Sequence, residues 1–204
     1  MKLIDISHTL DETTPIFPGD YKTAISRHKS LEKDDCTAYL LQSYLHTGTH
    51  IDAPMHLIND DRTVKDFPLD KFYGKGVLID ARGEKLIEMK PIYRDIIDEQ
   101  SIVLLFTGFD TVYFKEEYFT RHPVVGDDFA KFLLSRKIKI LGMDMPAPDY
   151  SPFLFHKELL KVGIFVLENL TNLESLVGIG NFEVIALPLK ISAEASFVRA
   201  VCKI

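Results

Sequence analysis

The run HTGTHIDAPMH, residues 46–56, constrains the fold of this chain more than any other stretch. Its β-branched threonines and isoleucine, together with Gly48 and Pro54, disfavour a helix through restricted rotamers, backbone entropy and a missing N–H donor. We therefore predict extended backbone, in which alternate residues lie on one face. That face carries all the ionisable side chains of the run, which are His46, His50, Asp52 and His56.

A straight strand would separate these four side chains too widely for a common role. At about 3.3 Å per residue, His46 and His56 would lie about 33 Å apart. The chain must therefore curl. We expect bends at Gly48, which can adopt φ angles that other residues avoid, and at Pro54, which ends ladder pairing.

The residue types on this face predict a metal site. Any one of the histidines alone would more often be a hydrogen-bonded structural or surface group than a ligand. For four ionisable groups on one face, a shared metal is the favoured interpretation, because burying these groups without partners would cost several kcal/mol. Neutral imidazoles and a carboxylate are ligands that zinc, manganese and iron accept.

Strand-like and helix-like segments are interleaved along the chain, which predicts an α/β fold in one domain, residues 1–204. The strand-like segments are short, β-rich and bounded by Gly, Pro, Asp or Asn. They cover residues 37–45, 75–81, 101–108, 137–144, 163–168, 182–189 and 196–204.

Two segments show helical periodicity. In GDDFAKFLLSRK, we expect Asp127 or Asp128 to cap the start of the helix. In SPFLFHKELLKVG, we expect Ser151 as the N-cap, Pro152 at the first helical position and Gly163 just past the end.

Charge and targeting signals narrow the classes of function. The net charge of -6, the pI of about 5.6 and the lack of a Lys/Arg cluster argue against a nucleic-acid partner.

The start MKLIDISHTLDETTP contains no signal-peptide core, and no stretch approaches the roughly 20 apolar residues of a membrane helix. Cys36 and Cys202 have no disulfide-scaffold spacing. We expect free thiols in a cytoplasmic protein without a membrane partner.

Two further residues are potential ligands outside the histidine run. His156 lies in the second helical segment, where the local pattern favours a partly exposed helix residue. Glu168 ends the apolar run 164–167. A carboxylate at the end of such a strand is equally typical of a turn and of a functional site.

These residues resemble a known family, the metal-dependent cyclase-like hydrolases, which include bacterial kynurenine formamidases (arylformamidases) and isatin hydrolases. The resemblance covers nearly the whole chain, through IDISHTLDETTPIFPGD, HTGTHIDAPMH and FHKELLKVGIFVLENLTNL. The pattern HxGTHxDxPxH is highly specific. The resemblance implies an α/β cyclase-like fold with a central barrel-like β-sheet flanked by helices, and a homo-oligomer, usually a dimer or tetramer.

The resemblance also implies a site for two divalent metal ions per subunit, zinc or alternatively manganese. The ligands of one ion would be His46, His50 and Asp52. Those of the second ion would be Asp52, His156 and Glu168, with the two carboxylates bridging.

Two residues outside these ligand sets also match the family. His56 matches its catalytic acid/base, and Phe17 matches a position where formamidases commonly present tryptophan to an aromatic substrate. This chain has no tryptophan. Phenylalanine retains aromatic stacking but lacks the area and the N–H of the indole. A phenylalanine between Ile16 and Pro18 fits a core position equally well.

The residues and the resemblance together predict a metal-dependent amidohydrolase acting on a small aromatic N-formyl or cyclic amide, with N-formyl-L-kynurenine as the named substrate. A metal-bound hydroxide would attack, and His56 would transfer the protons. The alternatives are hydrolysis of another small amide, an isatin-like lactam or an ester. From a different class, the metal could stabilise a non-catalytic binding or assembly module, although such a module has no use for an unligated His56.

Overall fold

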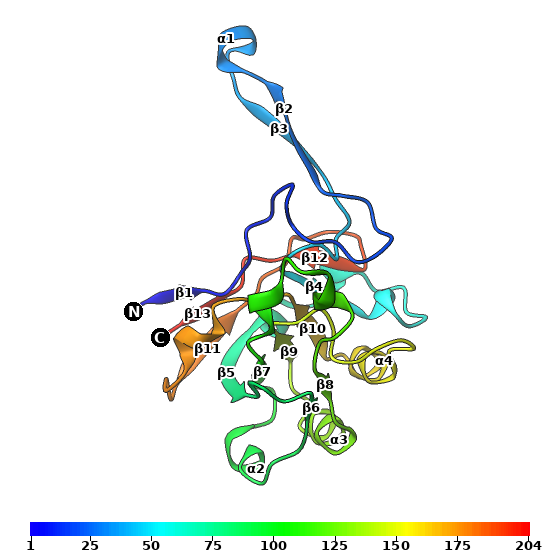
Figure 1. The fold of residues 1–204 in the computed structure, drawn as a ribbon, viewed down its shortest axis with the longest axis vertical. Helices are drawn as coiled ribbons and strands as arrows, with labels where there is room; N and C mark the ends of the chain where they lie inside the picture. Colours follow the sequence, from blue (N-terminus) through cyan, green and yellow to red (C-terminus); the bar gives the residue numbers. More distant parts are fainter.

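A nine-stranded sheet forms the centre of the protein in a computed structural model that describes residues 1–204 (Figure 1). The four central strands β5, β7, β9 and β10 pair in parallel, and the outer strands pair antiparallel. The sheet curls into a half-barrel flanked by few helices, so the predicted α/β class with a barrel-like sheet is confirmed. From one edge to the other, the strands are β1 (Leu3–Asp5), β13 (Val201–Lys203), β11 (Phe182–Ile185), β5 (Tyr73–Asp80), β7 (Ile102–Phe106), β9 (Ile140–Met143), β10 (Phe165–Glu168), β4 (His50–Asp52) and β12 (Ala195–Phe197).

Strand β7 shows how the sheet is buried on both faces. All of its residues are buried, and successive side chains belong to opposite apolar clusters, as Leu104 and its neighbour Leu105 do. The cluster that contains Leu105 is covered by helices α3 (Asp127–Ser135) and α4 (Leu154–Lys161). Strands β10 and β4 lie beyond β9 in the same sheet, and both contribute to the candidate site.

Six of the seven predicted strand segments each overlap a single strand. The prediction of one strand over residues 196–204 is wrong, because this segment contains most of β12 and the whole of β13. Phe197 of β12 lies opposite His50, whereas Val201 of β13 lies opposite Asp5. Between these two strands the chain therefore passes from one edge of the curled sheet, formed by β12, to β13, which lies next to the opposite edge strand β1.

Helix α3 occupies the predicted segment, but its cap differs. The N-cap is Gly126, without a side-chain capping hydrogen bond, so the capping role predicted for Asp127 or Asp128 is wrong. Both carboxylates instead lie in the first turn, where they interact favourably with the helix dipole.

Helix α4 begins later than predicted. Its N-cap is Phe153, so Ser151 is not the cap and Pro152 is not the first helical residue. The carboxylate of Asp149 accepts the backbone N–H of Phe155 at 2.9 Å and so satisfies a donor in the first turn. Gly163 lies just past the helix end with φ of 75°, as predicted.

Several elements lie outside the central sheet. Strands β2 (Ala24–Lys29) and β3 (Ala38–Gln42) form a hairpin that projects from the body of the protein, with α1 (Leu31–Asp34) at its tip (Figure 1). A second small sheet pairs β6 with β8. None of the helices combines the length and the apolar composition of a membrane span. The remaining elements are β6 (Leu86–Ile87), β8 (Val124–Val125) and α2 (Tyr93–Ile96).

Candidate metal centre and active site

The run 46–56 curls at the two predicted positions. Gly48 adopts φ of 67° in the turn that leads into β4, and Pro54 begins a short 3-10 helix just after β4 ends. Strand β4 pairs antiparallel with β10, which places His50 directly opposite Glu168. Strand pairing thus brings a distant carboxylate beside the histidine run.

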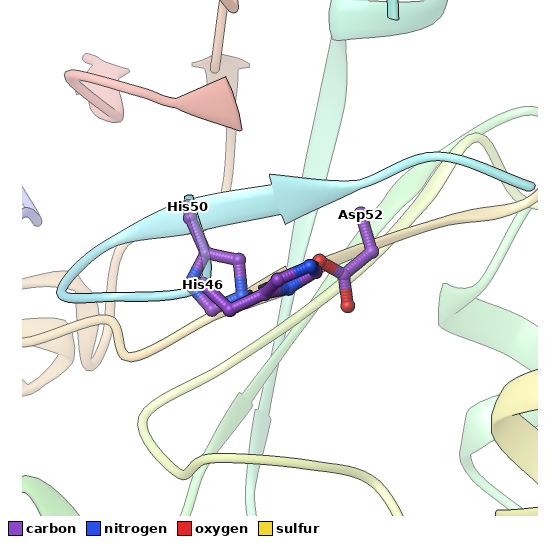
Figure 2. Close-up of side chains that lie close together, drawn as sticks. All are labelled: His46, His50 and Asp52. Atoms are coloured by element: carbon purple, nitrogen blue, oxygen red, sulfur yellow. Dashed lines mark ion pairs between the residues drawn. The ribbon is translucent and has the colours of Figure 1, made fainter. Parts of the chain in front are cut away.

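Asp52 is at the centre of a first group of potential metal ligands (Figure 2). Its Oδ1 atom lies 2.8 Å from Nδ1 of His46 and 3.3 Å from Nε2 of His50. His50 and Asp52 are buried, whereas the side chain of His46 is 22% exposed. The structure therefore brings together the three residues expected to hold one ion.

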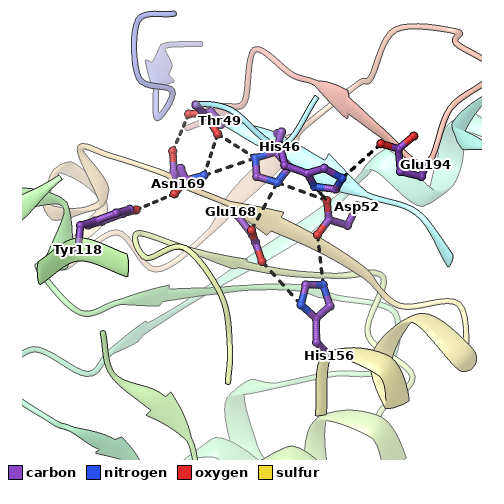
Figure 3. Close-up of polar contacts among 10 residues, drawn as sticks. His46, Thr49, Asp52, Tyr118, His156, Glu168, Asn169 and Glu194 are labelled. Carbon is purple, nitrogen blue, oxygen red and sulfur yellow. Dashed lines mark hydrogen bonds and ion pairs between the residues drawn. The ribbon is translucent and has the colours of Figure 1, made fainter. Parts of the chain in front are cut away.

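Asp52 also belongs to a second group, with His156 from α4 and Glu168 from β10 (Figure 3). Its Oδ2 atom lies 3.2 Å from Nε2 of His156. The two oxygens of Glu168 lie 3.9 Å from Nδ1 of His156 and 3.4 Å from Nε2 of His50. His156 and Glu168 are both buried, so the alternatives of an exposed helix residue and a turn residue are wrong.

The chemistry of this centre fits a divalent cation. Six of its side-chain atoms are buried without a hydrogen-bond partner, and each such atom would cost about 1–3 kcal/mol if nothing satisfied it. Around a tetrahedral zinc ion with ligands at about 2.0 Å, neighbouring ligand atoms lie about 3.3 Å apart. Several of the separations found here are close to that value. The six atoms are His46 Nε2, His50 Nε2, Asp52 Oδ1, Asp52 Oδ2, His156 Nε2 and Glu168 Oε1.

Charge within the centre favours protonated histidines when no cation is bound. Burial lowers the pKa of both His46 and His50, but the neighbouring carboxylates together outweigh burial and raise these pKa values to about 9 and about 10. Asp52 acts on both histidines, with Glu194 beside His46 and Glu168 beside His50. Burial alone would raise the pKa of Asp52, yet the two histidines hold it well below its usual range. A metal ion must displace these protons in order to bind.

A hydrogen-bond network orients His50. Its Nδ1 atom lies 2.9 Å from the carbonyl oxygen of Gly48, so Nδ1 donates to this oxygen and Nε2 faces the carboxylates, where its lone pair becomes available to a cation once the Nε2 proton is displaced. Asn169 donates from Nδ2 to the same carbonyl at 2.9 Å, and its Oδ1 accepts the buried Tyr118 hydroxyl at 2.8 Å. The Thr49 hydroxyl donates to the carbonyl of Asn169 at 2.6 Å.

Three polar residues around the candidate ligands had not been predicted from the sequence, namely Tyr118, Asn169 and Glu194. Glu194 lies on the exposed side, with Oε1 3.5 Å from Nε2 of His46 (Figure 3). Asn169 had a weak signal, since it follows Glu168 and adopts φ of 56°, a region that asparagine tolerates. Tyr118 and Glu194 have no local signal, because only the tertiary structure brings them to the site.

His56 lies beside the ligand groups without belonging to either. Its ring centroid is 4.0 Å from that of His46 and 5.9 Å from that of His156. Burial lowers the pKa of His56 to about 4, so its imidazole is neutral at pH 7. A neutral imidazole in this position can accept a proton.

A cavity of about 430 Å³ opens onto the centre. Phe17 is 49% exposed and lines this cavity, with its ring edge-on to Phe119 at a centroid distance of 5.8 Å. The alternative of a core position for Phe17 is therefore wrong. A groove of about 720 Å³ lies beside α3 and contains neither group of potential ligands. The other residues that line the smaller cavity include Tyr44, His46, His56, Phe153, His156, Glu168 and Glu194.

Comparison with known proteins identifies the family. Residues 4–150 match the model of the cyclase family, described as "Putative cyclase". The chain belongs to this family. It is 34% identical to the kynurenine formamidase of Bacillus cereus over 207 residues, which cover 98% of this chain and 96% of the relative. It is 32% identical to the kynurenine formamidase of Geobacillus thermodenitrificans, over 97% of this chain and 95% of the relative.

Solved structures agree with the fold. Isatin hydrolase A from Labrenzia aggregata, bound to benzyl benzoate, superposes with a TM-score of 0.87 at 24% identity, over 100% of this chain and 93% of that chain. An isatin hydrolase bound to the product analogue thioisatinate has a TM-score of 0.89 at 23% identity, over 100% and 92% of the two chains. These likenesses confirm the cyclase-like architecture that the sequence resemblance implied.

Proposed function

We propose that this protein is a metal-dependent amidohydrolase that cleaves the C–N bond of a small aromatic N-formyl or cyclic amide. One observation carries the proposal: two groups of potential metal ligands share Asp52 beside a cavity with aromatic walls. The kynurenine formamidase relatives, which align over nearly the full chain, support the reaction class. The specific substrate that we propose is N-formyl-L-kynurenine, whose hydrolysis would give L-kynurenine and formate.

The proposed cofactor is a pair of divalent ions, zinc or alternatively manganese. His46, His50 and Asp52 would hold one ion, and Asp52, His156 and Glu168 the other. Asp52 directs one oxygen toward each group, and Glu168 directs its oxygens toward His50 and His156, so these two carboxylates would supply the negative charge that holds the ions. When bound, such ions lower the pKa of water and polarise a carbonyl group.

His56 supplies the proton transfers in this proposal. Because its imidazole is neutral at pH 7 and borders the cavity, it can take a proton from the attacking water. The water oxygen bonds to the carbonyl carbon, the C–N bond breaks, and His56 returns the proton to the departing amide nitrogen. The products of an N-formyl aryl amine are then the free arylamine and formic acid, which releases its proton to solvent and leaves as formate.

The walls of the cavity favour an aromatic substrate. Phe17, Tyr44, Phe119 and Phe153 line it, and its volume lies within the roughly 300–1,000 Å³ of small-molecule sites. Phe17 is exposed enough to contact a ligand and would stack on the aryl ring.

The test is hydrolysis by the purified protein of N-formyl-L-kynurenine, formanilide, isatin and an aliphatic formamide, with metal content measured on the same samples. We expect the highest kcat/KM for an aryl formamide. His56→Ala should lose activity, while His28→Ala, which alters an exposed histidine on the projecting hairpin, should not. Preference for isatin would assign lactam hydrolysis instead. Metal-loaded protein that hydrolyses none of the four would support a non-catalytic module and reject the proposal.

A further inference from the structure

Three carboxylates line the cavity beside the candidate metal centre, namely those of Asp20, Glu168 and Glu194. Glu168 is a candidate metal ligand, and Oε1 of Glu194 lies 3.5 Å from Nε2 of His46. Asp20 is partly buried, yet its carboxylate forms no hydrogen bond and no ion pair. The fold therefore leaves one carboxylate of the cavity wall without a partner.

A tight turn places Asp20 close to the aromatic residue that we propose to contact the substrate. The backbone N–H of Asp20 donates to the carbonyl oxygen of Phe17 at 3.0 Å, and Gly19 has φ of 102°. Such a hydrogen bond closes a four-residue β-turn, in which the first and last Cα atoms lie less than about 7 Å apart. Phe17 and Asp20 both line the cavity. One turn thus supplies an aromatic ring and a negative charge to the same part of the wall.

The turn itself does not explain an aspartate at position 20. Pro18 and Gly19 supply its backbone conformation, because proline suits the second position of a type II turn and glycine the third. An aspartate that stabilises a turn accepts a nearby backbone N–H through its side chain, as Asp11 does from Thr13 at 2.7 Å. Asp20 makes no such bond, so its carboxylate is free to accept a hydrogen bond from a ligand.

The charge of the cavity wall indicates which kind of ligand group fits beside Asp20. No lysine or arginine lines the cavity. Outside the candidate metal centre, a carboxylate on a ligand would therefore find no cationic side chain, whereas an ammonium group would find the carboxylate of Asp20. This arrangement attracts one charge and repels the other, which is how a site discriminates between ligands of similar shape.

Other side chains of the same cavity show that it is a ligand site. His156 and Glu168 are only 3% and 6% exposed and line the cavity, yet His156 Nε2 and Glu168 Oε1 have no hydrogen-bond partner. Buried polar atoms are normally paired, so these atoms indicate that the cavity holds a ligand at this end. A ligand that reacts there and stacks its aryl ring on Phe17 directs the substituents of that ring toward Asp20.

We propose that Asp20 selects substrates that carry an ammonium group on a short side chain of the aryl ring. The proposal rests on the proposed function, because it takes the ligand to be an aryl amide. The ammonium group donates to the Asp20 carboxylate, and such a charge-assisted hydrogen bond is stronger than a neutral one. In N-formyl-L-kynurenine, Asp20 binds the α-ammonium group while the α-carboxylate faces solvent. Asp20 determines specificity and takes no part in proton transfer.

Two derivatives of N-formyl-L-kynurenine test the two charged groups separately. The methyl ester keeps the ammonium group and lacks the negative charge, whereas the Nα-acetyl derivative keeps the carboxylate and lacks the positive charge. We expect the methyl ester to keep the kcat/KM of the parent within about threefold, and the Nα-acetyl derivative to lose about tenfold through KM. A methyl ester that is hydrolysed no better than the Nα-acetyl derivative would overturn the proposal.

Substitution of Asp20 assigns the discrimination to this residue. Asp20→Asn removes the charge with little change in shape, so the difference of about tenfold between N-formyl-L-kynurenine and its Nα-acetyl derivative should disappear. Asp20→Glu keeps the charge and should retain a preference for the ammonium group. The matched control is Asp61→Asn, at an exposed aspartate outside the cavity, which should keep the wild-type discrimination. If Asp20→Asn raises KM equally for both compounds, the role of Asp20 is structural and the proposal is wrong.

Formanilide separates failure of this proposal from failure of the proposed function. It carries no charged group, so its hydrolysis by the wild type reports the amidohydrolase activity alone. If formanilide is hydrolysed but the two derivatives are not distinguished, only the role of Asp20 is wrong.

Binding tests Asp20 even if no amide is hydrolysed. Titration calorimetry then compares L-kynurenine with Nα-acetyl-L-kynurenine on the wild type and on Asp20→Asn. Tighter binding of L-kynurenine by the wild type alone would support the ammonium site. Equal affinities, or no binding of either compound, would overturn it.

Discussion

Replacement of Asn169 by alanine tests how the residues around the candidate ligands prepare the metal centre. Asn169 holds the carbonyl of Gly48 through Nδ2, and the same carbonyl accepts the Nδ1 hydrogen of His50. Its Oδ1 accepts the hydroxyl of Tyr118, which is fully buried. The substitution therefore acts on two buried polar groups and on the orientation of one candidate ligand.

The expected loss of stability has two parts. Alanine at φ of 56° is in the left-handed region and costs about 1–2 kcal/mol. The Tyr118 hydroxyl loses its acceptor inside the protein, which costs about 1–3 kcal/mol. We expect the free energy of unfolding of the metal-free protein to fall by about 2–5 kcal/mol, measured by urea denaturation.

Metal affinity separates an orienting role of Asn169 from a purely structural one. Loss of a group that supports a ligating histidine typically lowers metal affinity about 10–100-fold. We therefore expect titration calorimetry with zinc to show a loss of this size for Asn169→Ala. Tyr118→Phe removes only the hydroxyl and keeps the bond to Gly48, so its zinc affinity should stay near that of the wild type.

Asn172→Ala is the matched control for backbone conformation. Asn172 has φ of 57°, almost the same as Asn169, but it is exposed and does not contact the candidate ligands. Its variant should incur the conformational cost while zinc affinity remains unchanged. If Asn169→Ala and Asn172→Ala have the same zinc affinity, the proposed orientation of His50 through Asn169 is wrong.

Four further predictions follow from the site. His56→Ala should lower kcat by roughly a hundredfold or more with metal content unchanged, whereas His50→Ala should lose metal; loss of metal in both variants would show that the assigned roles are wrong. Phe17→Ala should raise KM for an aryl amide about tenfold with little effect on Tm or on an aliphatic amide, and a parallel loss for both substrates would reject stacking. Chelation should abolish hydrolysis and zinc or manganese should restore it, so full activity in rigorously metal-free protein would contradict the proposal. Burial lowers the pKa values of His46 and His50, but the carboxylates around them, chiefly that of Asp52, together raise these values to about 9 and about 10. Protonation of the two histidines therefore stabilises the metal-free fold fully below about pH 6.5, and this contribution is lost as pH rises through 9 to 10. The Tm of metal-free protein should therefore fall between pH 7 and pH 10, and a flat Tm profile would contradict the pairing.

Local chemistry determined much of the first ligand group. Within HTGTHIDAPMH, glycine, proline and β-branched residues exclude a helix, and the bends at Gly48 and Pro54 occur where their backbone properties allow them. His46, His50 and Asp52 are close in sequence, so a short turn and a three-residue strand suffice to bring them together. The interleaved strand and helix patterns likewise predicted the α/β class, because they depend on side-chain periodicity within each segment.

The tertiary structure decided which distant residues complete the site. Local pattern left Glu168 as either a turn or a site residue, and the antiparallel register of β4 against β10 placed it opposite His50. Local pattern favoured an exposed His156, but packing of α4 buried it beside Asp52. The packing that covers both faces of the sheet depends on contacts between segments far apart in the chain, and residue propensity does not specify which segments pair. For the same reason, only the folded chain decided three further features. These are the split of residues 196–204 between two parts of the sheet, the approach of Glu194 to His46, and the projection of the hairpin formed by β2 and β3.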